Sequence, residues 1–312
     1  MVRRQQPTET FLCLWIEDKL MKISVVMICK NESAVIERAL KSVDGCDELI
    51  ICDTGSDDNT VEIAKRYTDK VCTDFKWCDD FSAARNHAKS HATGDWILSL
   101  DADEFVHDFS EVRRAVELAQ SNAIRCTLIA EGRADLEFTF ARLFKNVSEI
   151  EWVEPIHNHL NISGEGERVG DVKITFGWSP AHEKDPDRAL RILEKAVKQD
   201  PTPRRLYYLG REYWYKQQYE KCVLALGRQV RTDLWPAQRA DGFLIMSMAF
   251  SKLGQDDDAR DACLQAININ SDFKEAVEWM ANISLSQNAQ QWRRMAETAN
   301  NRDLLIMRSP AN

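Results

Sequence analysis

The spacing of apolar residues alternates between two patterns along the first hundred positions. Continuous apolar runs rich in β-branched residues, typical of strands buried on both faces, alternate with segments of helical spacing. The predicted strands are 23–28, 48–52, 70–72 and 96–100, and the predicted helices are 34–43, 59–67 and 81–92. This alternation predicts a parallel sheet with helices on both faces, in which ligands bind beyond the carboxyl ends of the strands.

The pattern changes after residue 103 and again near residue 183. A helix at 110–120 is followed by strands at 126–130, 136–144 and 172–178, which predict antiparallel additions and a mixed sheet. From residue 186 onward every segment has helical spacing, with a degenerate repeat close to the tetratricopeptide period. We therefore predict an α/β domain at 21–182, an all-α helical-repeat domain at 183–312 and an N-terminal extension at 1–20.

Composition narrows the class of protein. The 312 residues carry a net charge of −9 and are 44% hydrophobic, which excludes disordered and collagen-like chains. Residues 1–182 hold 21 Lys/Arg against 32 Asp/Glu (−11), and residues 183–312 hold 20 against 18 (+2), which argues against indiscriminate binding to nucleic acid. Nine cysteines without a C-x-x-C pair favour reduced thiols in a cytoplasm. No apolar run is long enough for a signal peptide or a membrane span.

Carboxylates follow three of the predicted strands. Glu32 comes after the first strand, Asp53 ends the second, and Asp101 and Asp103 follow the fourth. Clustered carboxylates repel one another unless a cation lies between them. Mg²⁺ or Mn²⁺, bound by one or two carboxylates and by diphosphate oxygens, is the simplest solution.

Several motifs, in the same order, resemble the family 2 glycosyltransferases of the GT-A fold. They are 23–32, 51–57, 81–88 and 94–104, the last reading G-D-W-I-L-S-L-D-A-D-E. Arg142-Leu143-Phe144-Lys145-Asn146 followed by Ile156-His157 is similar to a signature of a bacterial and phage branch that often carries tetratricopeptide-like helices. The resemblance covers about residues 22–180. It implies a GT-A domain, an inverting reaction and a nucleotide-sugar donor.

The resemblance also implies roles for particular residues. Asp53 would bind the nucleotide base, which the resemblance suggests is uracil, with Glu32 near the base or ribose. Arg85 would contact the nucleotide or its phosphates. Asp101 would hold the ribose or the metal, and Asp103 would be a direct metal ligand.

The catalytic base and a third metal ligand are sought around residues 152–160. His157 matches the branch signature and is expected to be a metal ligand or an active-site contact, with Glu154 as a candidate base. Asn158 stands where the branch usually has Glu, so the pattern departs from the family there. His182, just after the last predicted strand, is the other candidate for the third ligand.

Basic and aromatic residues are interleaved in the helical region. Arg204, Arg205, Arg211 and Trp214 are candidates for a surface that binds an acceptor: a glycan, a protein, or phage DNA with hydroxymethylated bases. The competing interpretation, which we favour because aromatics at these positions fit the repeat, is a helical-repeat core with buried aromatics and solvated arginines.

The leading hypothesis is thus a metal-dependent inverting glycosyltransferase that uses Mn²⁺ or Mg²⁺ and a UDP-sugar, in the cytoplasm. Two alternatives remain: a non-catalytic helical-repeat binding protein with a vestigial GT-A domain, and a haloacid-dehalogenase-like phosphatase. The phosphatase is disfavoured because its nucleophilic Asp belongs on the first strand, and Asp101 follows the fourth.

Overall fold

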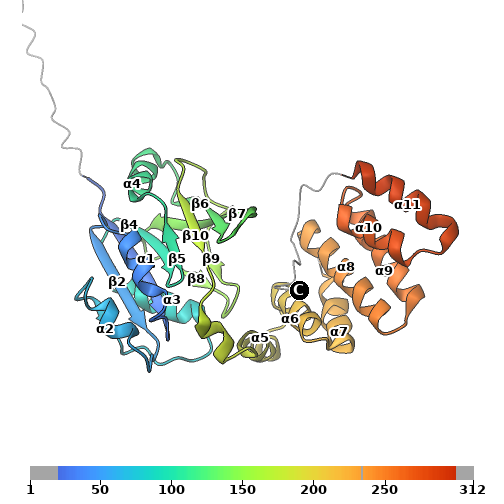
Figure 1. Ribbon diagram of the computed structural model, residues 1–312, viewed down its shortest axis with the longest axis horizontal. Helices are drawn as coiled ribbons and strands as arrows, with labels where there is room; N and C mark the ends of the chain where they lie inside the picture. The colour runs from blue at the N-terminus through green and yellow to red at the C-terminus, as the bar shows by residue number, and fades with distance from the viewer. Residues whose placement is uncertain (1–19, 233–234, 300–312) are drawn as a thin grey trace, which may run out of the picture.

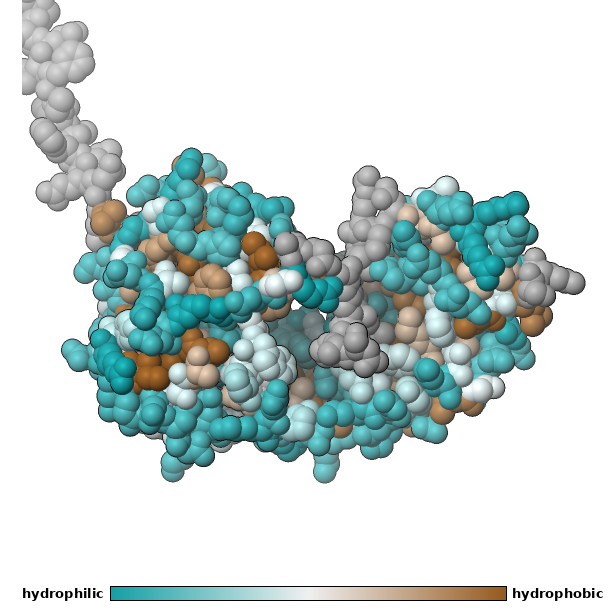
Figure 2. Space-filling view, in the orientation of Figure 1, coloured by the Kyte–Doolittle hydropathy of each residue, from teal (hydrophilic) through white to brown (hydrophobic). Residues whose placement is uncertain are grey.

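A computed structural model describes residues 20–232 and 235–299. These residues form two lobes, an α/β lobe and a helical lobe, connected through α5 (Arg188–Gln199) (Figure 1). Figure 2 shows a largely hydrophilic face on both lobes, with a notch between them. The predicted extension at 1–20 lies outside the described residues except for Leu20.

The α/β lobe is built on one eight-stranded sheet with the order β3-β2-β1-β4-β7-β6-β10-β5. Strands β1 to β4 are parallel, whereas β7 and β5 run antiparallel to their neighbours. A separate antiparallel pair joins β8 to β9. The strands of the described residues are β1 (Ile23–Cys29), β2 (Glu48–Asp53), β3 (Val71–Cys72), β4 (Trp96–Asp101), β5 (Glu104–Val106), β6 (Ala123–Ala130), β7 (Arg133–Lys145), β8 (Trp152–Val153), β9 (His159–Leu160) and β10 (Lys173–Phe176).

Apolar side chains on both faces of the sheet hold the lobe together. All seven residues of β1 are buried, as the continuous apolar run predicts. Because successive side chains of a strand point to opposite faces, Val25 and Met27 pack in the core with α1 (Ile36–Ser42) and α4 (Phe109–Leu118). Val26 and Ile28 pack in the core with α3 (Phe81–Ser90). The short α2 (Thr60–Ala64) follows β2.

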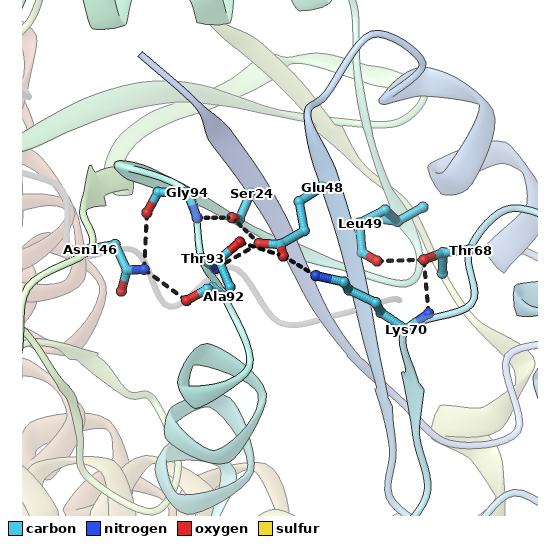
Figure 3. A network of polar contacts seen from close by, with 9 residues as sticks. All are labelled: Ser24, Glu48, Leu49, Thr68, Lys70, Ala92, Thr93, Gly94 and Asn146. Atoms are coloured by element: carbon cyan, nitrogen blue, oxygen red, sulfur yellow. Dashed lines mark hydrogen bonds and ion pairs between the residues drawn. The ribbon is translucent and has the colours of Figure 1, made fainter.

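The amino ends of the strands are joined by a network of polar contacts (Figure 3). The Glu48 carboxylate accepts hydrogen bonds from Ser24, Lys70 and Thr93, including the Thr93 backbone N–H at 2.8 Å. Gly94 passes so close that a Cβ there would lie 2.6 Å from the Ser24 hydroxyl oxygen. This network ties β1, β2 and β4 at the edge opposite to the strand-end carboxylates.

The helical lobe consists of successive hairpins, in agreement with the predicted all-α region. A Cβ at Gly210 would lie 2.4 Å from Leu226 Cγ, so only glycine allows α6 (Pro203–Tyr215) and α7 (Tyr219–Gln229) to pack this closely. No helix of the described residues is long and apolar enough to cross a bilayer. The elements are η1 (Pro180–Lys184), α5 (Arg188–Gln199), α6 (Pro203–Tyr215), α7 (Tyr219–Gln229), α8 (Pro236–Lys252), α9 (Asp256–Ile269), α10 (Lys274–Ile283) and α11 (Ser286–Thr298).

The fold class is confirmed: a mostly parallel α/β sheet covered by helices, followed by helices only. The sequence pattern did not predict β5, β8 or β9, because strands of two or three residues are too short to show a period. The change from sheet to helices falls between β10 and α5, and the division at 182/183 stays a prediction.

Candidate active site

The strand ends predicted to carry the chemistry lie in register. Cys29 of β1 pairs with Asp53 of β2, and Ile28 pairs with Asp101 of β4. From β1 the chain first adds β2 and β3 on one side and then β4 on the other, so the order of strands reverses at β1. Open α/β sheets bind ligands at such a switch point, beyond the carboxyl ends.

A cavity of about 1090 Å³ opens at this edge. Its volume lies just above the ~300–1000 Å³ range of small-molecule sites. The strand ends, the loop after β3, η1 and α5 together supply the walls, so both lobes contribute. Of the residues predicted from the sequence, those that line the cavity are Glu32, Arg85, Asp101, Asp103 and His157.

Two arginines neutralise part of the negative charge in the cavity floor. Arg85 on α3 forms an ion pair with Asp101 and donates to Ser99 Oγ at 3.3 Å. Arg142 on β7 pairs with Glu104 at 2.6 Å and contacts Asp101 at 3.4 Å. Burial acts to raise the pKa of Asp101, but the two guanidiniums outweigh it and hold this pKa well below its usual range. Asp101 is therefore a permanent anion.

Asp103 differs from its neighbours because no ion pair to it is found among the described residues. Burial and the charges of Asp101, Glu104 and Glu32 raise the pKa of Asp103 to about 7. Burial likewise raises the pKa of Glu104 to about 7, against the attraction of Arg142. The cavity floor thus holds more negative charge than its arginines balance, and Asp103 is the open carboxylate.

Of the two other residues predicted to contact the nucleotide, Glu32 lines the cavity and Asp53 does not. Glu32 lines the cavity, accepts a hydrogen bond from the Ser179 hydroxyl, and has a pKa raised by burial. Asp53 is buried, and its Oδ2 accepts from the N–H groups of Gly55 and Ser56 at 3.0 and 2.9 Å. Because its oxygens stabilise this turn, Asp53 shapes the wall of the cavity rather than lining it.

Of the two candidates His157 and Glu154, only His157 lines the cavity. His157 lines the cavity with a positive φ of 50°, and its ring stacks on Tyr208 with 4.0 Å between centroids. His157 is exposed at the cavity, and partial desolvation of its ring, together with the charges of Arg211 and Arg204, lowers its pKa. The lowered pKa argues against a base at His157, and its role as a metal ligand stays a prediction, because the two arginines would repel a cation as well as a proton.

Glu154 does not fit the base role predicted for it. Its Oε2 accepts from Arg205 Nε at 2.7 Å, and it is not among the described residues that line the cavity. The ion pair joins the loop after β8 to α6, so the carboxylate contributes to the contact between the lobes. The side chain of the other metal candidate, His182, lies outside the described residues.

The residues predicted to bind the acceptor are also occupied elsewhere. Arg204 donates to the His157 carbonyl at 2.9 Å, and Arg205 pairs with Glu154, so both hold the lobes together. Arg211 is packed among tyrosines and donates to Tyr215 at 3.0 Å. Trp214 packs on the helical core beside Tyr219. The core interpretation therefore describes these residues better than a free acceptor surface does.

Sequence reasoning missed the basic residues that do face the cavity from the helical side. These are Lys184 of η1 and Arg188 and Arg191 of α5. They follow the last strand without a motif, so only the packing of α5 against the α/β lobe reveals them. Arg142 was visible in the sequence as part of a signature, but nothing there assigned it to Glu104.

A divalent cation fits the donor set of this cavity. Asp101 and Asp103 supply oxygen atoms, the ligands that Mg²⁺ and Mn²⁺ prefer. Among the described residues, no three carboxylates of the cavity bring their oxygens within 4.8 Å of one another. This geometry agrees with an ion held by one or two carboxylates and completed by other oxygens, as is usual for Mg²⁺ with phosphates.

Comparison with known proteins decides the family. The family model "Glycosyl transferase family 2" matches residues 24–171, the segment that contains every strand end described above. This segment is a family 2 glycosyltransferase domain. The sheet with its switch point and the helices on both faces are the GT-A architecture that the resemblance implied.

Two curated relatives are named for helical repeats and for glycosyl transfer. A TPR repeat-containing protein of Synechococcus elongatus is 41% identical over 151 residues, which is 46% of this chain and 36% of the relative. The prophage-derived glycosyltransferase SunS of Bacillus subtilis is 26% identical over 223 residues, 67% of this chain and 53% of SunS. The chain thus spans only a third to a half of these relatives. The crystal structure of S. aureus TarS 1–349 superposes with a TM-score of 0.49 at 13% identity, over 80% of this chain and 91% of TarS.

Proposed function

We propose that the chain is a metal-dependent inverting glycosyltransferase that moves a sugar from UDP to a nucleophile on a macromolecular acceptor in the cytoplasm. The observation that supports it most is the open Asp103 carboxylate at the switch point of a family 2 domain, surrounded by charges that raise its pKa.

Each residue of the cavity floor then has a separate task. Asp103 and Asp101 would hold Mn²⁺ or Mg²⁺, with His157 as a further ligand. When bound, the ion supplies positive charge to the leaving diphosphate. Arg85 and Arg142 keep Asp101 ionised and fixed in position. The Nε–H groups of Arg85 and Arg142 are buried without a hydrogen-bond partner among the described residues.

The nucleotide would lie along the ends of β1 and β2. Asn31 and Thr54 line this side, and Asn31 has a left-handed φ of 59°. Such strain costs about 1–3 kcal/mol and concentrates at ligand sites. His157 and Asp79, also with positive φ, line the same cavity. Asp53 would act by holding the turn that carries the base-binding wall.

The acceptor would enter from the side of α5. Lys184, Arg188 and Arg191 make this side basic, which suits an acceptor with phosphate or carboxylate groups. With Glu154 paired outside the cavity, the carboxylates on this side are Asp79 and Asp185, both contacted by Arg191.

The test is release of UDP from a panel of UDP-sugars, with GDP-sugars in parallel, by the full chain with and without Mn²⁺. The proposal expects turnover of at least one UDP-sugar that stops when Mn²⁺ is chelated. Phosphate release without dependence on a nucleotide would instead support the phosphatase alternative. No turnover and no binding of any nucleotide sugar would support the non-catalytic one.

A further inference from the structure

A second cluster of metal-binding side chains lies outside the cavity, on α3 and the loop before it. His87 Nε2 is 3.2 Å from Asp74 Oδ1 and 3.5 Å from His91 Nε2. The ligand atoms of Asp74, His87 and His91 all lie within 4.8 Å of one another, and no other described group of three His, Cys, Asp or Glu side chains does so.

The local sequence explains why these side chains meet. His87 is in the last turn of α3, and His91 is its C-cap, so the two lie four residues apart on one face of the helix. Asp74 reaches them from the loop that follows β3. The carboxyl end of a helix also carries partial negative charge, which favours a cation there.

The distances match a coordination polyhedron. Bonds of ~2.0–2.1 Å from Zn²⁺ to His nitrogen or carboxylate oxygen place neighbouring ligands of a tetrahedron about 3.3–3.4 Å apart. The observed separations of 3.2 and 3.5 Å bracket this value. A hydrogen bond between two imidazole nitrogens satisfies only one lone pair, whereas a metal ion satisfies both.

We propose that Asp74, His87 and His91 bind a divalent transition-metal ion of the Zn²⁺ class, with water or another external ligand completing the shell. Two imidazoles and one carboxylate favour Zn²⁺, Co²⁺ or Ni²⁺ over Mg²⁺. The cavity with Asp101 and Asp103 offers carboxylate oxygens and favours Mg²⁺ or Mn²⁺. The two sites would therefore take different ions, and this proposal does not depend on the proposed sugar transfer.

The ion would restrain a loop that belongs to the cavity. Asp74 is the second residue of the segment 73–80, in which Trp77 and Asp79 line the cavity. The same segment meets the helical lobe, where Lys195 donates to the Cys78 carbonyl at 3.1 Å and Arg191 contacts Asp79 at 3.4 Å. Asp80 caps α3 at the other end of the loop. A metal bond at Asp74 would fix the loop at both ends.

The first test is Zn²⁺ titration by calorimetry, with the full chain freed of metal and carrying Asp103→Asn to remove the cavity ligand. We expect one site, and an affinity at least about 10-fold lower after His91→Gln or Asp74→Asn, because loss of an outer-shell partner alone costs ~10–100-fold. Asp69→Asn, an exposed acid nearby, is the matched control and should bind as the parent does. Absence of Zn²⁺ binding by the parent would overturn the proposal, and so would a Zn²⁺ affinity of His91→Gln and Asp74→Asn equal to that of the parent.

The second test is hydrogen exchange of residues 73–80 with and without Zn²⁺. Exchange should slow with Zn²⁺ in the parent and stay unchanged in His91→Gln. Zn²⁺-dependent protection that persists in His91→Gln would mean that the ion acts elsewhere. Retained UDP-sugar turnover in the absence of Zn²⁺ would leave this proposal intact, so the two proposals fail separately.

Discussion

The amino ends and the carboxyl ends of the parallel strands each border a cavity with a carboxylate, but Glu48 at the amino ends has an ion-pair partner, whereas Asp103 at the carboxyl ends has none among the described residues. At the amino edge, a groove of about 940 Å³ contains Glu48, whose carboxylate accepts hydrogen bonds from three residues (Figure 3). These bonds overcome the cost of burial and lower the pKa of Glu48 to about 2. At the carboxyl edge, the pKa of Asp103 is raised to about 7.

Size and polarity therefore do not distinguish a structural hollow from a ligand site in this protein. The distinction lies in whether each buried charge already has its partner. Satisfied charges stabilise the fold, and unsatisfied ones are compensated by something that the chain itself does not supply. Removing the unpaired charge at the carboxyl edge should thus affect activity, whereas removing a paired charge at the amino edge should affect stability.

The largest expected effect is on activity at the carboxyl edge. Asp103→Asn should lower UDP-sugar turnover about 100-fold or more, because the carboxylate that would hold the cation is lost. Its thermal midpoint should not fall, since the change removes a repelled charge. Asp171→Asn, an exposed acid of the same lobe, should turn over as the parent does. Full activity of Asp103→Asn would contradict the assigned role.

The next effect is on stability in the cavity floor. Arg142→Ala leaves the buried Glu104 without its arginine and should cost about 3–5 kcal/mol, whereas the partly exposed Asp101 keeps Arg85. Lys70→Ala at the amino edge should cost about 1 kcal/mol or less, because Lys70 is half exposed. Urea denaturation at pH 7 measures both, and equal losses would remove the contrast between the edges.

A smaller effect, with a defined pH dependence, is expected at Glu48. Glu48→Gln should lower stability by about 1–3 kcal/mol at pH 7, with donor binding unchanged. The folded pKa of about 2 lies below the ordinary 4.5, so the carboxylate stabilises the fold above pH 4.5 and loses this effect as pH falls toward 2. The difference between the proteins should shrink over that window in denaturation curves. A difference that is constant with pH would show that ionisation of Glu48 is not involved.

The smallest effect concerns the contact between the lobes. Arg205→Ala removes the pair with Glu154, which is partly buried, and should cost about 1 kcal/mol while UDP-sugar hydrolysis stays near the parent value. If both Arg205→Ala and Glu154→Gln lost UDP-sugar hydrolysis, Glu154 would be restored as the candidate base. Equal hydrolysis in all three proteins supports its reassignment.

The sequence predicted the parts of the fold that depend on local pattern. β1, β2, β4 and the helices between them follow from apolar runs and helical spacing, because both faces of the sheet are covered. Because parallel strands end at the same edge of a sheet, Glu32 after β1 and Asp101 at the end of β4 lie at one edge. Short strands such as β5 depend on their neighbours and leave no local signal.

Partners contributed by distant segments could not be predicted. Glu154 and Arg205 are 51 residues apart, and only the packing of α6 on the loop after β8 makes them a pair. The same holds for Arg142 with Glu104 across the sheet. The sequence shows which residue types are available near a site, whereas the three-dimensional contacts decide which charges stay unpaired.

The most direct measurement of the central claim is calorimetric titration of UDP into the parent chain and Asp103→Asn, each with and without Mn²⁺. The account predicts that Mn²⁺ tightens UDP binding to the parent at least about 10-fold, a coupling of about 1.4 kcal/mol, and has no such effect on Asp103→Asn. Equal tightening of UDP binding by Mn²⁺ in both proteins would contradict it.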